Sequence, residues 1–194
     1  MIIESVGTSL VVGKLRKGKF SYLKDAEIHK WYLIVFAFLL EFIAVFLSSR
    51  GYQFVSNNIF SIHLISYSLL FVGIYFNISK LSFKLIMLGT FLNFLVIMLN
   101  GGQMPVSQDA MIRAGLTGDL DALINGEIIT HTVIGKDTVL KFLGDIFILA
   151  KPYPKPKVFS LGDVFLAIGI FVYIQEIMVK KYIKAKKDLG SDLK

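Results

Sequence analysis

Residues 31–48 read WYLIVFAFLLEFIAVFLS, a stretch in which Glu41 is the single charged residue. As an α-helix this stretch is about 27 Å long, and the hydrocarbon core of a bilayer is about 30 Å thick. Trp31 and Tyr32 stand at its start, where transmembrane helices place interfacial aromatic residues. The stretch therefore predicts a membrane-spanning helix, and it decides the fold class of the chain.

Three further apolar blocks contain few charged residues, namely residues 59–76, 81–99 and 161–179. The chain is 55% hydrophobic and 18% charged, with a mean hydropathy of +0.66, whereas soluble domains hold roughly 25% charged residues. These blocks predict an all-α integral membrane protein, a single membrane domain over residues 1–194 with four full transmembrane helices.

Residues 1–12 form a shorter apolar stretch that Glu4 interrupts. They are too few to cross a bilayer at full thickness, so they predict a short N-terminal helix that is a tilted short span, a half-span or an interfacial helix. Basic residues follow this stretch, the reverse of the order in a secretory signal peptide. The chain has no cysteine, which excludes disulfides, thiolate metal sites and cysteine nucleophiles.

Lysine and arginine are distributed unevenly between the connections. Six lie in residues 13–30, one in the next connection, two around residues 77–84 and six in the tail, residues 180–194. Because short cytoplasmic connections carry the excess of basic residues, we expect the chain in the cell membrane with its C-terminus in the cytoplasm. The loop of residues 100–160 is then extracytoplasmic.

The net charge is +7, and the basic residues stand directly beside the apolar blocks. This arrangement predicts contact with a bilayer of anionic headgroups, and no nucleic-acid binding, which needs a basic face on a folded domain. A partner membrane subunit stays an open alternative, and the sequence names no cofactor.

The loop of residues 100–160 carries signals of local structure. Ser107 is a candidate N-cap for a short helix that ends at Gly115, and a second short helix is expected from Asp119 to Ile124. Residues 138–149 hold apolar residues at helical spacing but are too few to cross the membrane. They predict a re-entrant or interfacial helix, which folds the loop back as a cap over the outer ends of the spans.

The sequence KPYPKPK follows at residues 151–157. Alternating prolines favour an extended polyproline II conformation, so this segment is predicted to be a strut leading to the last span.

Glu41 lies near the middle of the first span. A charged residue at this depth costs about 2.5–3.5 kcal/mol on insertion scales, so we expect Glu41 inside the bundle and uncharged or hydrogen-bonded. Ala37, Ala44 and Ser48 share its helical face, and such small residues let a neighbouring helix approach. Two interpretations stay open, an interhelical hydrogen bond or the binding of a ligand, ion or proton.

The other spans carry stripes of polar and small residues at helical spacing. The stripes hold His63, Ser66, Gly73 and Asn77, then Gly89, Asn93 and Asn100, then Gly162, Gly169, Tyr173 and Glu176. Such stripes usually join helices. If they converged on Glu41, His63 and Asn93 would instead line a small polar cavity.

Two Leu-Gly-Asp sequences each open an apolar segment. Asp163 follows Ser160 in the pattern of a capping box, in which a serine N-cap and an acid three residues later satisfy the first helical N–H groups. Asp145 has no serine three residues earlier, so capping explains it less well and it is a candidate ligand-binding residue. His131 has no partner at metal-ligand spacing, and no metal site is expected.

The third span is followed by Asn100-Gly-Gly-Gln103-Met-Pro-Val106. The glycines and the proline predict a turn. This turn either ends the helix only, or folds back so that Asn100 and Gln103 line a site.

Four motifs occur in a fixed order: Asn100-Gly-Gly-Gln-Met-Pro-Val106, His131-Thr132, Leu143-Gly-Asp145, and Ser160-Leu-Gly-Asp-Val164 with Leu166-Ala-Ile-Gly169. In these motifs the chain resembles an uncharacterised family of bacterial membrane proteins, domain-of-unknown-function family 5317. The resemblance implies a multi-span fold in which the outer loop distinguishes the family, and it implies no activity. Ala150-Lys151 departs from the pattern, which has a proline-bearing end to the first Leu-Gly-Asp segment.

Two functional hypotheses follow. The first is a non-enzymatic membrane protein that binds a small ligand, ion or partner subunit through its polar core and outer loop. The alternative is a membrane-embedded enzyme or transporter that acts on a lipid or small solute through Glu41, Asp145, Asp163 and His131. The chain has no Gly-x-Ser-x-Gly elbow, phosphate-binding glycine loop or His-Glu-x-x-His motif, but an intramembrane enzyme with an unfamiliar site stays an open alternative. A cavity on which these groups converge would favour the second hypothesis, and a closed, dry bundle would favour the first.

Overall fold

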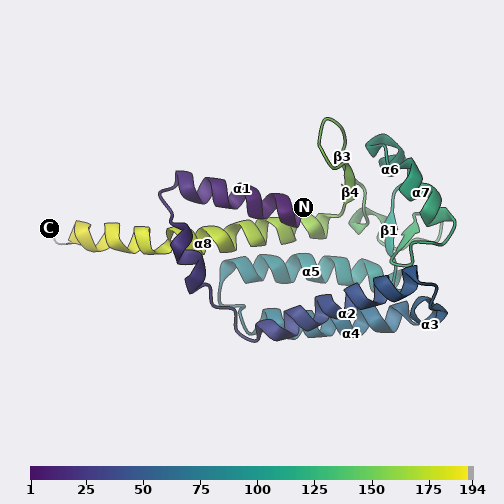
Figure 1. Ribbon diagram of the computed structural model, residues 1–194, viewed down its shortest axis with the longest axis horizontal. Coiled ribbons are helices and arrows are strands. Elements are labelled where there is room, and N and C mark those ends of the chain that lie inside the picture. The colour runs from purple at the N-terminus through teal and green to yellow at the C-terminus, as the bar shows by residue number, and fades with distance from the viewer. Residues whose placement is uncertain (192–194) are drawn as a thin grey trace.

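The computed structural model describes the backbone of residues 1–191 and the side chains of residues 1–179. Five longer helices in this part of the chain run side by side (Figure 1). They are α1 (Ile2–Leu15), α2 (Trp31–Ser49), α4 (Ile59–Tyr75), α5 (Leu81–Leu99) and α8 (Leu161–Ser191). Their order in space is α1, α8, α5, α4, α2, because each helix packs against the next.

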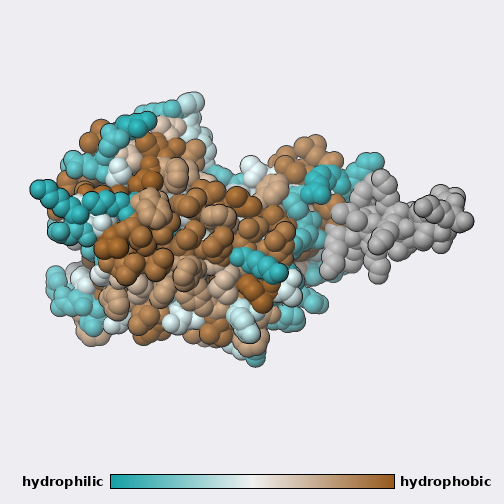
Figure 2. All heavy atoms as spheres, turned by 180° about the vertical axis from the view of Figure 1, so that it is seen from behind, coloured by the Kyte–Doolittle hydropathy of each residue, from teal (hydrophilic) through white to brown (hydrophobic). Residues whose placement is uncertain are grey.

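The apolar helices have the character that the sequence predicts. Three are long and apolar enough to cross a membrane, namely α2, α5 and the Leu161–Val179 part of α8. The helix α4 has 17 residues, so three of the four predicted spans, not all four, reach the length of a full crossing. Figure 2 shows hydrophobic side chains gathered over the helices, with hydrophilic ones toward the ends.

The helix α1 extends along α8 rather than away from the bundle. Its buried face consists of the small residues Ser5, Ser9 and Gly13. The Ser5 hydroxyl donates a hydrogen bond to the Ala167 carbonyl oxygen, and Gln175 Nε2 donates to the Ser9 carbonyl oxygen over 2.6 Å. Small residues at every fourth position let two helices approach closely, and this spacing in the sequence indicates the contact.

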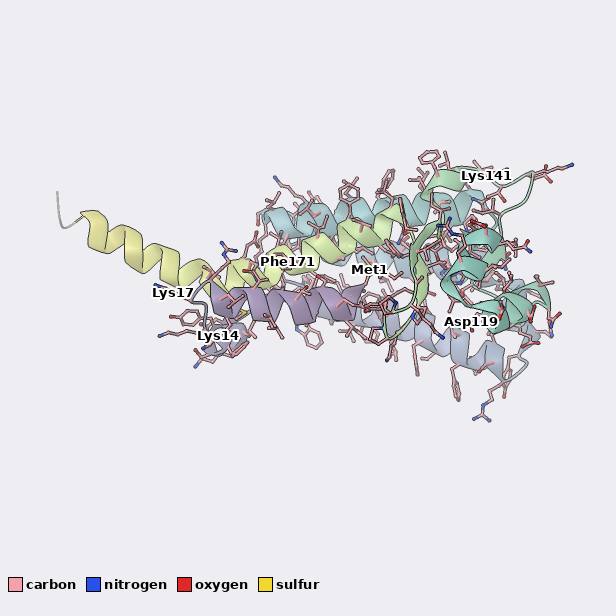
Figure 3. All side chains as sticks on the ribbon, turned by 90° about the horizontal axis from the view of Figure 1, so that it is seen from above. Met1, Lys14, Lys17, Asp119, Lys141 and Phe171 are labelled. Carbon is pink, nitrogen blue, oxygen red and sulfur yellow. The ribbon has the colours of Figure 1, made fainter. Side chains whose placement is uncertain are left out.

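The basic segments meet at one end of the bundle, called here the basic end. The Lys19 N–H donates to the Met178 carbonyl oxygen over 3.3 Å, and Lys80 Nζ donates to the Glu27 carbonyl oxygen over 2.7 Å. The short 3-10 helix η1 (Phe20–Asp25) lies between Lys19 and Glu27 in the chain and packs against α8. In Figure 3, Lys14 and Lys17 lie toward this end, whereas Asp119 and Lys141 lie at the other.

Residues 100–160 form a folded cap at the opposite end, called here the cap end. Its elements are β1 (Met104–Val106), α6 (Gln108–Ala114), α7 (Thr117–Ile124), β2 (His131–Val133), η2 (Lys141–Leu143), β3 (Phe147–Leu149) and β4 (Lys157–Phe159). Strand β1 pairs with β2 in parallel, and β3 pairs with β4 antiparallel. The short helix α3 (Gln53–Asn57) joins α2 to α4.

The two short helices of the cap follow their sequence signals. The Ser107 hydroxyl accepts a hydrogen bond from the Ala110 N–H over 3.2 Å, and Gly115 ends α6 in the left-handed region, with φ of 79°. Helix α7 begins at Thr117, two residues before the predicted start at Asp119. Val106, Met111, Leu120 and Leu123 form the apolar core that these helices cover.

The prediction of a re-entrant or interfacial helix over residues 138–149 is wrong. These residues contain the single turn η2 and the strand β3. Gly144 lies so close to β1 that a Cβ atom there would be 2.4 Å from the Pro105 carbonyl oxygen, and the Asp145 N–H donates to that same oxygen over 2.8 Å. This contact needs extended backbone, so the chain continues into β3, which pairs with β4, instead of forming a helix. The fold is therefore mostly rather than all helical.

The proline-rich segment is also different from its prediction. Residues 150–156 turn the chain back on itself between β3 and β4, so the segment forms a hairpin connection rather than an extended strut, and its last residue, Lys157, begins β4. The pairing of β3 with β4 holds the rings of Phe147 and Phe159 stacked at 5.6 Å. Lys157 and Tyr153 also contact the Glu4 carboxylate, which joins this hairpin to the start of α1.

Candidate functional site

Glu41 joins α2 to α4 through a histidine. Its Oε1 lies 2.9 Å from His63 Nδ1, and the Glu41 side chain is 24% exposed. Ala37 and Ala44, on the same face of α2, are 0% and 3% exposed, so this face of small residues is the one that lies against α4. Gly73 of α4 makes room, since a Cβ atom there would be 2.7 Å from Ile34 Cγ1.

The second nitrogen of His63 has no such partner. His63 is 6% exposed and therefore does not face water, and its Nε2 makes no hydrogen bond to any described residue. The ring of Tyr67, one turn along α4, lies at 6.4 Å. A carboxylate at one imidazole nitrogen fixes the orientation of the ring and leaves the other nitrogen to donate or accept.

We expect the protein to tolerate the substitution of Glu41 by glutamine but to be destabilised by its substitution by alanine. Glu41→Gln can keep a hydrogen bond to His63 Nδ1, so the free energy of unfolding should change by less than about 1 kcal/mol. Glu41→Ala leaves Nδ1 buried without a partner, which costs about 1–3 kcal/mol. Thermal unfolding in detergent compares the two variants, and equal midpoints for them would contradict the interhelical link.

Asp163 combines its capping role with a bond to α5. The Asp163 N–H donates to Ser160 Oγ over 3.0 Å, and the Ser160 N–H donates to Asp163 Oδ2 over 3.1 Å, which completes the expected capping box. Asn93 Nδ2 donates to Asp163 Oδ1 over 3.1 Å. The amide oxygen of Asn93, Oδ1, accepts from the Ser160 hydroxyl over 2.8 Å. The three side chains satisfy one another, so they join α5 to α8.

Asn100 and Gln103 fasten the cap to the end of α5. Asn100 exchanges two hydrogen bonds of 2.9 Å with the backbone of Val139, and Gln103 Nε2 donates to the Ile129 carbonyl oxygen over 2.9 Å. Gly102 has a φ of 86° and lies against the backbone of Phe60. The turn therefore ends the helix and also folds the chain back over the bundle.

Asp145 is the buried carboxylate of the cap. It is 7% exposed, and its Oδ2 lies 3.5 Å from His131 Nε2, while Thr130 Oγ1 lies 2.9 Å from His131 Nδ1. The other oxygen, Oδ1, makes no hydrogen bond to the described part of the chain. Burial raises the pKa of Asp145, and the contact with His131 opposes this shift.

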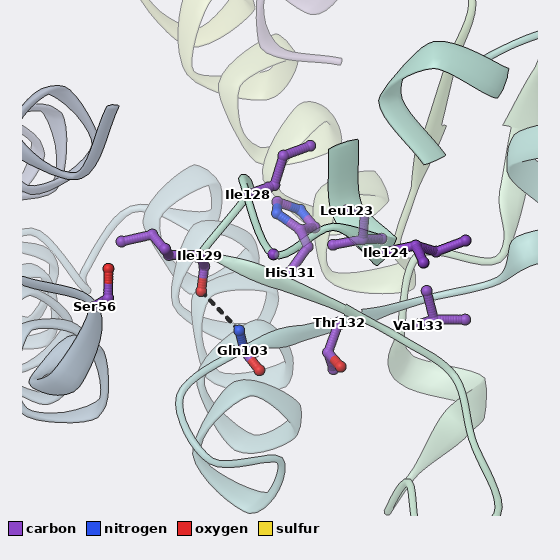
Figure 4. A pocket seen from close by; sticks show the side chains of 10 residues that line it. Ser56, Gln103, Leu123, Ile124, Ile128, Ile129, His131, Thr132 and Val133 are labelled. Atoms are coloured by element: carbon purple, nitrogen blue, oxygen red, sulfur yellow. Dashed lines mark hydrogen bonds between the residues drawn. The ribbon is translucent and has the colours of Figure 1, made fainter. Parts of the chain in front are cut away.

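A pocket of about 440 Å³ opens beside His131 (Figure 4). Its polar lining consists of Ser56, Gln103, His131 and Thr132, and its apolar lining of Leu123, Ile124, Ile128, Ile129 and Val133. No carboxylate, lysine or arginine is part of this lining. Since His131 also contacts Asp145, the buried carboxylate stands directly behind the polar side of the pocket.

The predicted residues fall into separate groups rather than one cavity. Glu41 pairs with His63, Asn93 pairs with Asp163, and Asp145 pairs with His131. Within the described residues no three histidine, aspartate or glutamate side chains are placed to hold a metal ion. The sequence reasoning missed the pair of His131 with Asp145 and the pocket beside it, because no spacing along the chain relates these residues.

The raised pKa of Asp145 predicts a pH dependence. A group whose pKa is raised by folding binds its proton more tightly in the folded state, so its contribution to stability is complete below its unfolded pKa of about 4. This contribution is lost as pH rises through the folded pKa. The unfolding midpoint of the wild type relative to Asp145→Asn should therefore fall as pH rises above 4.

Thermal unfolding in detergent at pH 4, 5, 6 and 7 measures this difference. Asp121→Asn is the matched control, because Asp121 is exposed on α7, and its difference from the wild type should stay constant. A wild type that gains stability over Asp145→Asn as pH rises would contradict the direction of the shift.

Comparison with known proteins adds relatives but no activity. The model of a family of unknown function, DUF5317, matches residues 25–175, which include every residue of the three pairs. An uncharacterized protein of Thermotoga maritima is 29% identical over 109 residues, which is 56% of this chain and 60% of that protein. No solved structure matches.

Proposed function

The chain belongs to DUF5317, a family of unknown function, and we propose that it is a multi-pass membrane protein that binds a small ligand under its cap. The observation that carries the proposal is the 440 Å³ pocket beside His131. This volume lies within the range of about 300–1,000 Å³ that small-molecule sites occupy. Residues that hold the cap in place also line the pocket, since Gln103 bonds the chain at Ile129.

The lining defines the chemistry of the ligand. Five of its side chains are aliphatic, and the polar ones are a hydroxyl on Ser56, an amide on Gln103, an imidazole on His131 and a hydroxyl on Thr132. The ligand is therefore a small, largely apolar molecule with one or two hydrogen-bonding groups. His131 is the anchor for such a group, because the contact with Asp145 behind it fixes the orientation of the imidazole ring at the pocket wall.

The alternative of an enzyme or transporter has less support. It requires Glu41, Asp145, Asp163 and His131 around one cavity, whereas these residues belong to separate pairs and both Asp163 oxygens are bonded to protein. Binding without catalysis needs only the pocket and its anchor.

A thermal-shift screen of small amphiphiles against the purified protein tests the proposal. Hits should raise the unfolding midpoint of the wild type, and His131→Leu and Ile129→Trp should abolish the shift by removing the anchor and filling the pocket. His29→Leu and Ile112→Trp are matched controls outside the pocket, on exposed positions. Ligands that stabilise the pocket variants as well as the controls would refute the site.

We also propose that the cap is extracytoplasmic and the basic end cytoplasmic, in the cell membrane. Support comes from the meeting of the segments 13–30 and 77–84 at one end of the bundle. Along the chain the five helices alternate in direction, and α1 runs beside α8 in the same direction. The start of α1 therefore lies on the side of the cap, where Glu4 contacts Lys157.

Cysteine labelling in intact cells checks this orientation, and the chain has no native cysteine to interfere. Asn125→Cys, exposed in the cap, should react with an impermeant reagent, and Lys24→Cys, exposed at the basic end, should react only after permeabilisation. Reaction of Lys24→Cys alone in intact cells would reverse the orientation.

A further inference from the structure

An apolar groove lies between α4 and α5, away from the pocket of the cap. Its volume is about 820 Å³. Phe71 and Tyr75 line it from α4, and Leu88 and Phe91 line it from α5. Among the described residues of its lining, Lys84 alone carries a charge.

The groove lies on the face of α5 that carries large side chains, because the small residue Gly89 is on the face toward α8. Gly89 lies against Gly162 of α8, where a Cβ atom would be 2.5 Å from a carbonyl oxygen, so large side chains remain on the face toward α4. Phe94 contacts Phe71 at 5.3 Å and Tyr67 at 5.5 Å between ring centroids. These rings close the groove toward the middle of the bundle, and it continues from them to Lys84.

The dimensions of the groove match one leaflet of a bilayer. Lys84 and Phe94 are ten residues apart on α5, which is about 15 Å along the helix axis and half of a hydrocarbon core of about 30 Å. Tyr75 is 67% exposed and Phe91 47% exposed, so the groove opens to the surroundings of the helices, where lipid chains lie.

The charge at its end is complementary to a phosphate. The Lys84 side chain is exposed, and Lys30 Nζ lies 5.8 Å from the ring of Phe76, which also lines the groove. Both ammonium groups stand at the basic end, at the level where headgroups of that leaflet begin.

We propose that this groove binds one acyl chain of an anionic phospholipid, whose phosphate contacts Lys84. The aromatic rings hold the chain along its length, and Lys84 selects the headgroup. The site is independent of the ligand pocket, because it lies at the opposite end of the bundle and shares no residue with it.

Native mass spectrometry of the detergent-purified protein tests the proposal with two probes, phosphatidylglycerol and phosphatidylcholine of identical acyl chains. The wild type should retain one phosphatidylglycerol in preference to phosphatidylcholine. Lys84→Gln should lower phosphatidylglycerol retention about three- to five-fold and phosphatidylcholine retention less, because the choline cation offsets the charge of its phosphate. Lys24→Gln, another exposed lysine of the basic end, should change neither.

Filling the groove tests the acyl-chain part separately. Leu88→Trp should reduce retention of both lipids, while Leu64→Trp, on an exposed α4 position outside the groove, should not; Val72→Phe tests the opposite wall if Leu88→Trp does not fold. Equal retention of the two lipids by the wild type, or equal losses from Lys84→Gln and Lys24→Gln, would overturn the proposal. So would full retention by the groove-filled variants.

Discussion

Replacing Gly89 by alanine is expected to destabilise the protein by about 1–3 kcal/mol, and replacing it by leucine is expected to prevent folding. A Cβ atom at this position would lie 2.5 Å from the Gly162 carbonyl oxygen and 2.8 Å from the Leu166 backbone nitrogen. Both are backbone atoms of α8 and cannot rotate away as a side chain can. The two helices must therefore separate, which breaks the bonds that Asn93 makes across their contact.

The test compares thermal unfolding midpoints and the yield of monodisperse protein after extraction in detergent. Gly7→Ala is the matched control, because Gly7 lies within α1 and a Cβ atom there would meet nothing within 4 Å. Alanine has the higher helix propensity, so this control should be neutral or stabilising by up to about 1 kcal/mol. Equal behaviour of Gly89→Ala and Gly7→Ala would show that α5 and α8 are not in close contact.

Asn93→Leu is expected to cost about 2–4 kcal/mol, because one substitution removes two interhelical hydrogen bonds and leaves their partners unsatisfied. Leucine has a similar size but cannot donate to the Asp163 carboxylate or accept from the buried Ser160 hydroxyl. Asn125→Leu, on an exposed position of the cap, serves as the control and should change stability little.

A double-mutant cycle separates the bond from other effects of the substitution. Asn93→Ala and Asp163→Ala, alone and combined, should show a coupling energy within the range of about 0.5–3 kcal/mol that contacting residues give. Additive losses would mean that the hydrogen bond between Asn93 and Asp163 contributes nothing to stability.

Several elements of this chain follow from local physical chemistry. The predicted limits 81–99 are those of α5 (Leu81–Leu99), and α2 extends the predicted 31–48 by one residue. An apolar run between polar ends forms a helix wherever its neighbours lie, because the helix satisfies its own backbone hydrogen bonds. The same locality applies to Ser107 at the start of α6 and to the box of Ser160 with Asp163, since each cap bonds within four residues.

The segment 138–149 shows where local patterns fail. Its apolar spacing predicts a helix, but the backbone of Asp145 bonds to Pro105 and Ser107, about forty residues earlier in the chain. Hydrogen bonds to a distant strand compete with the backbone hydrogen bonds of a local helix. The close contact of Gly144 with Pro105 favours the extended conformation over the helix. The helical periodicity of a segment carries no information about which distant strand will form hydrogen bonds with that segment.

By itself the sequence determined the long apolar helices, which are compatible with a membrane protein, the grouping of basic residues and the caps, since each depends on residues within one segment. Only the tertiary structure decided the partners of the polar residues. Glu41 with His63, and His131 with Asp145, come from elements that α2–α4 packing and the β1–β2 pairing bring together. A buried polar side chain needs a partner, but its identity depends on which elements become neighbours, and that is set by the close contacts of small residues and by strand pairing over the whole chain.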